Sequence, residues 1–160
     1  MKQRAIFSFL ALVLIALLIG ACSSAQPGVT SVPGQGVVAI EVIPNPIAAT
    51  PVSGNTYDFP FEIVVRETGG RPIDVRHITA TVSFGGGLTL GRESWDAEHI
   101  RSLGYDTRLV ANSEQRYRFT PRKEVPDERL FGGVSAELKV EATDDAGTAT
   151  SATTVVTVRR

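Results

Sequence analysis

The protein has 160 residues, of which 42% are hydrophobic and 21% are charged, and its formal net charge is −1. This balance lacks the strong positive charge with which proteins bind nucleic acid phosphates. Because Cys22 is the only cysteine, no disulfide can form within the chain, and burial of apolar surface must stabilise the fold. The length suffices for one ordinary hydrophobic core.

The first 21 residues are typical of a secretory signal. Lys2 and Arg4 precede an apolar run that extends from Ala5 to Ala21. As a helix, this run would measure about 25 Å at ~1.5 Å per residue, which is shorter than the roughly 30 Å hydrocarbon core of a membrane. A cleaved signal helix therefore fits better than a permanent membrane span. Removing Lys2 and Arg4 from the 16 basic residues leaves 14 against 17 acidic residues, so an anionic membrane surface would not attract the mature chain.

The sequence IGAC at residues 19–22 resembles the lipobox of bacterial lipoproteins, which consists of an aliphatic residue, two small residues and a cysteine. The resemblance implies that the Cys22 sulfur receives a diacylglyceryl group, that the chain is cut before Cys22, and that the new amino group is acylated. Several acyl chains together anchor a protein effectively permanently. By the same resemblance, Ser23 implies a location in the bacterial cell envelope, either at the outer membrane, on its periplasmic or surface side, or at the cell face of a single-membrane cell. The alternative is ordinary signal-peptidase cleavage after Ala25, which would release a soluble protein.

The residues after the lipobox predict a tether. Residues 23–36 are small, polar and rich in proline and glycine, a composition typical of flexible linkers. They would span at most roughly 45–50 Å when fully extended. We therefore expect a signal peptide at 1–21, a lipidated Cys22 with its tether at 22–36, and one folded domain at 37–160.

From Val37 onward, apolar and polar residues alternate with the period of two that is typical of β-strands. Pro60 indicates that one of these runs is an edge strand or contains a bulge. The strongest hairpin has Ala136, Leu138 and Val140 facing the core and the sequence DDAG as its turn. The strand-like runs are 37–43, 57–67, 73–84, 107–111, 115–119, 135–143 and 148–158.

The segment from Gly85 to Asp106 departs from the strand rhythm, and we interpret it as an insertion. Within it, SWDAEHIRSLG predicts a short helix with Ser94 as the N-cap and Gly104 just past the end. The helix would place Trp95 against one flank of the core.

About seven strands joined by turns predict an all-β fold, namely a single antiparallel immunoglobulin-like β-sandwich with one short helical insertion. The last hairpin, LKVEATDDAGTATSATTVVTV, is similar to the final two strands of bacterial immunoglobulin-like or fibronectin type III-like domains. A small open barrel is the alternative architecture.

Sequence motifs for catalysis are incomplete. Residues 86–91 have the glycine spacing of a phosphate-binding loop, but Arg92 and Glu93 replace the lysine and the hydroxyl residue. Asp96, Glu98 and His99, with His77 elsewhere, are too few zinc ligands. Asp144 and Asp145 fit a hairpin turn better than a calcium site. We therefore predict no catalytic residue, no metal site, no cofactor and no enzymatic activity.

The sequence RYRFTPRK leaves two interpretations open. Arg116, Arg118, Arg122 and Lys123 surround Tyr117 and Phe119. They could form a stripe that binds an anionic polymer. Alternatively, the aromatic residues face the core while the arginines face water, as in a half-buried strand. Acidic neighbours favour the second interpretation.

These observations predict a membrane-anchored, extracytoplasmic lipoprotein that acts as a non-catalytic binding or structural module. Its partners would be the lipid membrane, through acylated Cys22, and another envelope protein or a glycan, but not nucleic acid. We expect the insertion to make the partner contact, through Trp95, His99, Arg101 and Tyr105. The alternatives are an accessory subunit of an envelope assembly or secretion machine and a lipid-anchored hydrolase or metal-dependent enzyme. The oligomeric state stays open.

Overall fold

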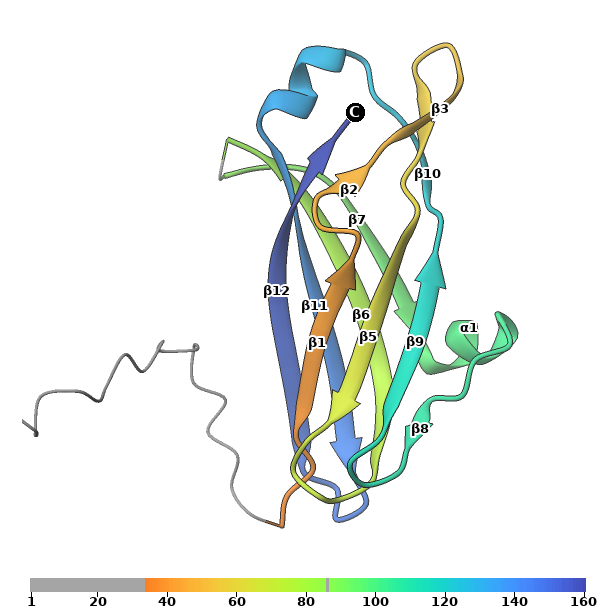
Figure 1. The fold of residues 1–160 in the computed structure, drawn as a ribbon, viewed down its shortest axis with the longest axis vertical. Coiled ribbons are helices and arrows are strands. Elements are labelled where there is room, and N and C mark those ends of the chain that lie inside the picture. The colour runs from red at the N-terminus through yellow and green to blue at the C-terminus, as the bar shows by residue number, and fades with distance from the viewer. Residues whose placement is uncertain (1–33, 86) are drawn as a thin grey trace, which may run out of the picture. The chain divides into compact units, whose positions relative to one another are not determined.

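The computed structural model describes residues 34–85 and 87–160 as an antiparallel β-sandwich with one short α-helix (Figure 1). This confirms the predicted all-β, immunoglobulin-like fold class. The predicted signal peptide, Cys22 and most of the tether lie outside the described residues. Within the described ranges, no helix combines the length and the apolar character needed to cross a membrane.

The larger sheet has the strand order β2 (Ile47–Ala48), β12 (Ala149–Arg159), β11 (Val134–Asp144), β6 (Ile73–Phe84) and β7 (Leu88–Asp96), and β8 (Arg108–Leu109) also pairs with β6. The predicted hairpin is the pair β11–β12. As predicted, Ala136, Leu138 and Val140 are buried. The alternation along these strands therefore reports correctly which face packs against the second sheet.

The smaller sheet is formed by β1 (Val38–Ile43), β5 (Phe61–Glu67) and β9 (Glu114–Phe119), and beyond them β3 (Thr50–Ser53), β4 (Thr56–Asp58) and β10 (Arg122–Glu124) pair as a separate ladder. Breaks at Pro60 and Pro121 separate β4 from β5 and β9 from β10, since proline has no N–H for the ladder. The Phe59 N–H still donates to the Pro121 carbonyl at 3.0 Å. Because β5 lies between β1 and β9, it is a central strand and not the edge strand that Pro60 indicated.

The predicted insertion includes an edge strand of the larger sheet. Strand β7 pairs along β6 with Trp95 opposite Ile78, and only Ala97–Ser102 forms the helix α1. The N-cap is Asp96 and not Ser94, and its carboxylate accepts the His99 N–H at 2.8 Å. Ser94 stays in the strand because pairing with β6 buries Trp95, and this burial outweighs the local capping preference.

Two other segments also differ from expectation. The runs around β8 and β9 do not pair with each other, because β8 joins β6 and β9 joins β5 in the other sheet. Residues 120–129, which lie outside the predicted strand-like runs, contain β10 and the beginning of a short 3₁₀ helix, η1 (Glu128–Gly132). In both cases pairing with distant strands decides the outcome.

At one end of the sandwich, a buried carboxylate connects three loops. Glu67, at the end of β5, is 2% exposed. Its oxygens accept four backbone N–H groups, from Val37 at 3.1 Å, Gly69 at 2.6 Å, Gly70 at 3.0 Å and Asn112 at 2.8 Å. These donors belong to the start of β1, the β5–β6 turn and the β8–β9 turn. Glu67 therefore holds these three segments together at the end of the sandwich where the described chain begins.

The same end requires glycine for close packing. A Cβ atom on Gly69 would lie 1.9 Å from the Gln35 carbonyl oxygen, and one on Gly36 would lie 2.5 Å from the Ile73 side chain. Gly36 is already buried, and its N–H donates to the Asp144 carboxylate at 3.2 Å. The chain is therefore part of the folded body from Gly36 onward.

Backbone donors lower the pKa of both carboxyls at this end. Burial alone raises the pKa of Glu67, but the N–H groups of Asn112, Val37, Gly69 and Gly70 outweigh it, so the pKa lies below its ordinary value. The N–H of Thr148 is the largest cause of the lowered pKa of Asp144, with further donors at Gly36 and Ala146. Both residues are therefore charged in the folded protein at neutral pH.

Replacing Glu67 with alanine leaves these four donors without an acceptor. We expect the free energy of unfolding to fall by about 3–5 kcal/mol, measured by urea denaturation. The matched control is Glu41→Ala on the neighbouring strand, whose side chain is 50% exposed and should cost less than about 1 kcal/mol. Equal losses in the two variants would contradict the role given to Glu67.

Acid should weaken the wild-type fold. Because the folded-state pKa values of Glu67 and Asp144 are lowered, their stabilisation is complete above the ordinary values of about 4.3 and 3.9, and it is lost as the pH falls through the folded-state values. We expect the free energy of unfolding to decline below about pH 4. The decline should be shallower in Glu67→Gln, which cannot titrate there, and identical pH profiles would argue against this linkage.

Candidate functional site

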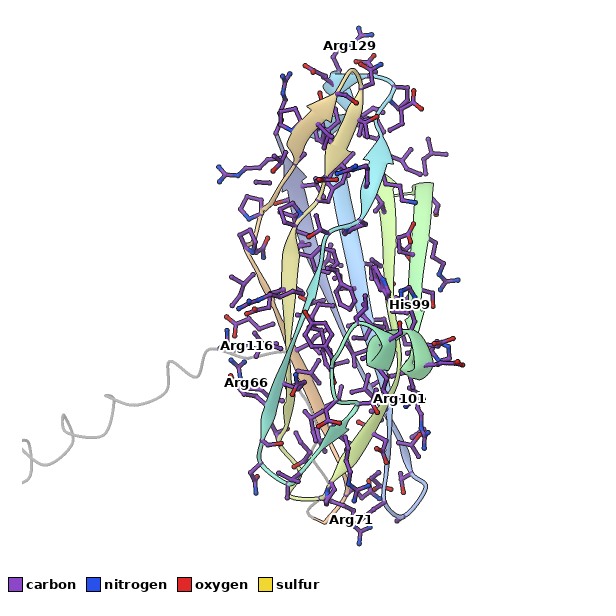
Figure 2. All side chains as sticks on the ribbon, turned by 90° about the vertical axis from the view of Figure 1, so that its right-hand side faces the viewer. Arg66, Arg71, His99, Arg101, Arg116 and Arg129 are labelled. Carbon is purple, nitrogen blue, oxygen red and sulfur yellow. The ribbon has the colours of Figure 1, made fainter. Side chains whose placement is uncertain are left out.

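The structure separates the four predicted contact residues. Trp95 is 7% exposed and stacks on Phe119 with ring centroids 4.2 Å apart, so it is a core residue, and the prediction that it contacts a partner is wrong. His99 and Arg101 are exposed on α1, at the side of the sandwich that faces the viewer in Figure 2. Tyr105 is half-buried, and its hydroxyl accepts the Arg118 N–H at 3.2 Å. For His99, Arg101 and Tyr105 the partner contact stays a prediction.

The arginine-rich strand β9 is half-buried, as the sequence favoured. Tyr117 and Phe119 are buried, while the arginines point outward. Arg116 and Arg118 both pair with Glu62, at 2.8 and 2.7 Å. The hydrogen bond from Arg118, followed by that from Arg116, lowers the pKa of Glu62. Because its charges are largely neutralised within the sheet, this face offers an anionic polymer little attraction.

The remaining sequence candidates also have structural roles. The Asp144 carboxylate accepts the N–H groups of Ala146 and Thr148 within the hairpin turn, at 3.0 and 2.7 Å. Arg92 and Glu93 lie on β7, not in a phosphate-binding loop, and Gly86 lies outside the described residues. In residues 34–85 and 87–160, no three side chains of the metal-ligating types come together.

A cavity of about 280 Å³ lies between the two sheets, at the end that carries the C-terminus. Small residues on the larger sheet, Ala80 and Ala136 with Gly91, leave this space unfilled. Phe59, Phe61 and Phe131 line it from the smaller sheet and from η1. The other lining residues are Ile47, Val82, Leu90, Arg92, Glu93, Pro121, Lys123, Glu124, Val125, Pro126, Leu130, Val134, Leu138 and Val158. The lining is therefore mainly aliphatic and aromatic.

The cavity reaches the surface between β7 and β10. Its lining there includes Leu90, which is 44% exposed, and Lys123, whose side chain is more than half exposed. Glu93 on β7 forms an ion pair with Lys123 on β10 across this opening. Farther along the same side of the sandwich, α1 and β8 follow β7 and lie beside β9 (Figures 1 and 2).

Strand β7 is an open edge. It ends the larger sheet and pairs only with β6 in the described part of the chain. Leu88 and Leu90 on this edge are 64% and 44% exposed. The register shifts between Val82 and Ser83, opposite Leu90. An unpaired strand with exposed leucines beside an apolar cavity is a natural binding surface for another chain.

Sequence reasoning missed the residues that shape this site. Ala136 was expected in the core, but its small size was not connected with a cavity. Gly91 was considered only for the glycine spacing of a phosphate-binding loop, yet it lies in β7 opposite Val82. A single alanine or glycine is no signal until one knows which residues face it from the other sheet.

No protein-family model matches the chain, and no curated protein gives a significant match. Among solved structures, the structural-genomics target SoR45 is similar, with a TM-score of 0.55, 12% identity, and coverage of 77% of this chain and 86% of that chain. A Bordetella pertussis protein provisionally assigned as ApaA has a TM-score of 0.52, 12% identity, and coverage of 81% and 99%.

The CARDB domain of the PF1109 protein from Pyrococcus furiosus, solved in complex with di-metal ions, is more distant. Its TM-score is 0.39 at 11% identity, with coverage of 79% of this chain and 90% of that chain. At such identities the first two similarities establish the fold alone, and the third carries no argument about this chain.

The burial of Trp95 can be tested directly against an exposed neighbour. We expect Trp95→Ala to lower the free energy of unfolding by about 3–5 kcal/mol, because it leaves a cavity beside Phe119. His99→Ala should change the free energy by less than about 0.5 kcal/mol. Circular dichroism during denaturation suits both variants, since Trp95 is the only tryptophan. A small loss in Trp95→Ala would mean that the stacked pair does not hold the core.

Proposed function

We propose that this protein is a lipid-anchored module of the bacterial cell envelope that binds another envelope protein and does not act as an enzyme. Two independent features support the proposal. The lipobox-like sequence at 19–22 supplies the attachment point at Cys22. The β-sandwich supplies a scaffold on which strand edges and loops are free to bind.

The observation that carries the binding role is the apolar cavity beside the open edge of β7. Its walls are aliphatic and aromatic, and the ion pair between Glu93 and Lys123 is at its opening. Such a lining suits the burial of an apolar group by the hydrophobic effect. We therefore assign the partner contact to the cleft between β7 and β10, in place of the predicted contact through Trp95.

The same chemistry favours a protein over a glycan. Placing sugar hydroxyls in an apolar cavity costs about 1–3 kcal/mol for each one left without a hydrogen bond. The only tryptophan, which could stack on a sugar ring, is buried in the core. A protein partner can supply apolar side chains and so avoids this cost.

The position of the cleft also fits display from a membrane. The described chain begins at the end fixed by Glu67, whereas the cavity is lined by Val158, close to the C-terminus at the other end (Figure 1). The long strands β11 and β12 have 11 residues each, or about 35 Å at ~3.3 Å per residue. A chain anchored at Cys22 would therefore present the cleft away from the attachment point of the tether.

The anchor can be tested by lipid labelling. We expect the full-length protein expressed in a bacterium to incorporate labelled palmitate and to sediment with membranes, because Cys22 carries the acyl chains. Cys22→Ser should lose both properties, while the neighbouring control Ser24→Ala should keep them. An unlabelled, soluble wild-type protein with its mature N-terminus after Ala25 would refute the anchor.

The binding role can be tested by site-specific photocrosslinking in intact cells. We expect a benzoylphenylalanine at position 90 to crosslink one discrete envelope protein, because the cleft lies beside Leu90. The matched control is position 155 on β12, where Val155 is also an exposed apolar strand residue, at 59%. Equal crosslinking at both positions, or none at position 90, would contradict the assignment of the cleft.

A further inference from the structure

We infer that the cleft binds an extended peptide segment, which adds as a strand to the outer edge of β7 and places a bulky apolar side chain in the cavity. This inference deepens the proposed function and rests on it, since it specifies the chemistry of the partner at the same cleft. It depends on two features that occur together at Leu88–Glu93. The outer edge of β7 has no paired strand there, and the apolar cavity adjoins it.

The first step concerns the backbone. Along Leu88–Glu93, the described residues form main-chain ladder bonds with β6 on one side only. The other side of β7 presents N–H and C=O groups that an added strand can pair with, as in β-strand addition. Two other edges of the sandwich are covered in part. Strand β2 pairs with Val158 and Arg159 at the end of β12, and the Tyr105 hydroxyl accepts the Arg118 N–H of β9.

The second step concerns the side chains. Gly91 lies opposite Val82, and residues that are paired across strands point to the same face of a sheet. Val82 and Gly91 both line the cavity, and a Cβ atom on Gly91 would meet no atom within 4 Å. A strand added beside β7 directs alternate side chains toward this same face. Its apolar residues therefore reach the cavity next to Gly91.

The third step excludes a second copy of this chain as the occupant. Glu93 also faces the cavity, where it forms the ion pair with Lys123. If two β7 strands paired antiparallel in one continuous sheet, the Glu93 residues of both copies would lie on the same face near the opening. Like charges across paired strands are destabilising. An inward-pointing charge on an edge strand is also a known protection against self-association.

A free acyl chain fits the edge less well than a peptide does. It would occupy the apolar space but would leave the N–H and C=O groups of β7 without protein partners. The combination of an unpaired edge and an adjoining cavity is satisfied only by an occupant that has both a backbone and apolar side chains. Fatty acid binding is therefore an outcome that the test must separate from peptide binding.

The test uses the folded full-length chain with Cys22→Ser, so that it is handled without lipid, and a phage library of random seven-residue peptides as the probe. Peptides are selected on this protein and synthesised with a fluorescent label, and affinity is measured by anisotropy. We expect the selected peptides to contain a phenylalanine, leucine, isoleucine or tryptophan whose replacement by alanine weakens binding at least tenfold. N-methylation of alternate backbone nitrogens in the peptide should also abolish binding.

Two variants of β7 locate the site. Gly91→Leu fills the cavity and should weaken peptide binding at least tenfold. Its fold should be retained, because the added Cβ meets no neighbour. The matched control Thr89→Leu places the same side chain at a β7 position that pairs with Ser83 and does not line the cavity, and it should change affinity less than twofold. The N-methylated peptides require no variant, so the test does not depend on the folding of Gly91→Leu.

Several results would overturn the inference. One is that no peptide is selected, and another is that peptides bind but neither N-methylation nor Gly91→Leu weakens the binding. A third is that palmitate binds in the cavity while peptides do not bind. The last is that the protein forms a concentration-dependent dimer, which Leu90→Lys dissociates. If position 90 still crosslinks an envelope protein in cells while peptides fail, the proposed function stands and strand addition alone is refuted. If that crosslink is absent but peptides bind, the peptide site stands and the role in the envelope falls.

Discussion

The contact on which the described structure most depends is the stacking of Trp95 on Phe119. Trp95 lies on β7 and Phe119 on β9, so the pair joins the two sheets at the side of the sandwich where their edges meet. Phe61 packs edge-on against Trp95 and extends the cluster across β5. Large aromatic side chains bury much apolar surface at one place. They hold β7 opposite β9 and thereby set the distance between β7 and β10 farther along.

The two ends of the sandwich are stabilised in different ways. At the end where the described chain begins, Glu67 and Asp144 satisfy backbone donors from several loops, and glycines allow the chain to pack closely. At the other end, alanines face phenylalanines across a space that they do not fill. One end is therefore fixed by polar contacts of defined geometry, while the other keeps room for an apolar group. This asymmetry supports a binding role for the end that is farther from the beginning of the described chain.

The outer charges reinforce this assignment. Across β1, β5 and β9, the side chains of Glu41, Arg66, Glu114, Arg116, Glu62 and Arg118 form a continuous chain of ion pairs. Each exposed pair contributes little stability, about 0–1 kcal/mol, but together they leave the face nearly neutral. Electrostatic recognition by this face is therefore weak. The exposed Leu88 and Leu90 lie instead on β7, the edge strand of the other sheet.

The sequence alone determined the features that depend on local pattern. Alternation placed Leu138 and Val140 in the core, and it distinguished the buried Tyr117 and Phe119 from the outward arginines of β9. These predictions succeed because a strand has a period of two and a sandwich buries one face of it. The lipobox-like sequence at residues 19–22 is likewise a local pattern, and the proposed lipid anchor depends on it and not on the fold.

The tertiary structure decided everything that depends on distant partners. Ser94 and Trp95 have a good local helix-start pattern, yet pairing with β6 places them in a strand, because burial of Trp95 outweighs a cap. The donors to Glu67 come from three loops far apart in the chain. The cavity exists only because Ala80, Ala136 and Gly91 meet across the sandwich from Phe59 and Phe131. The space between two sheets depends on the side chains of both sheets. Only the way in which the sheets pack therefore shows that a cavity remains.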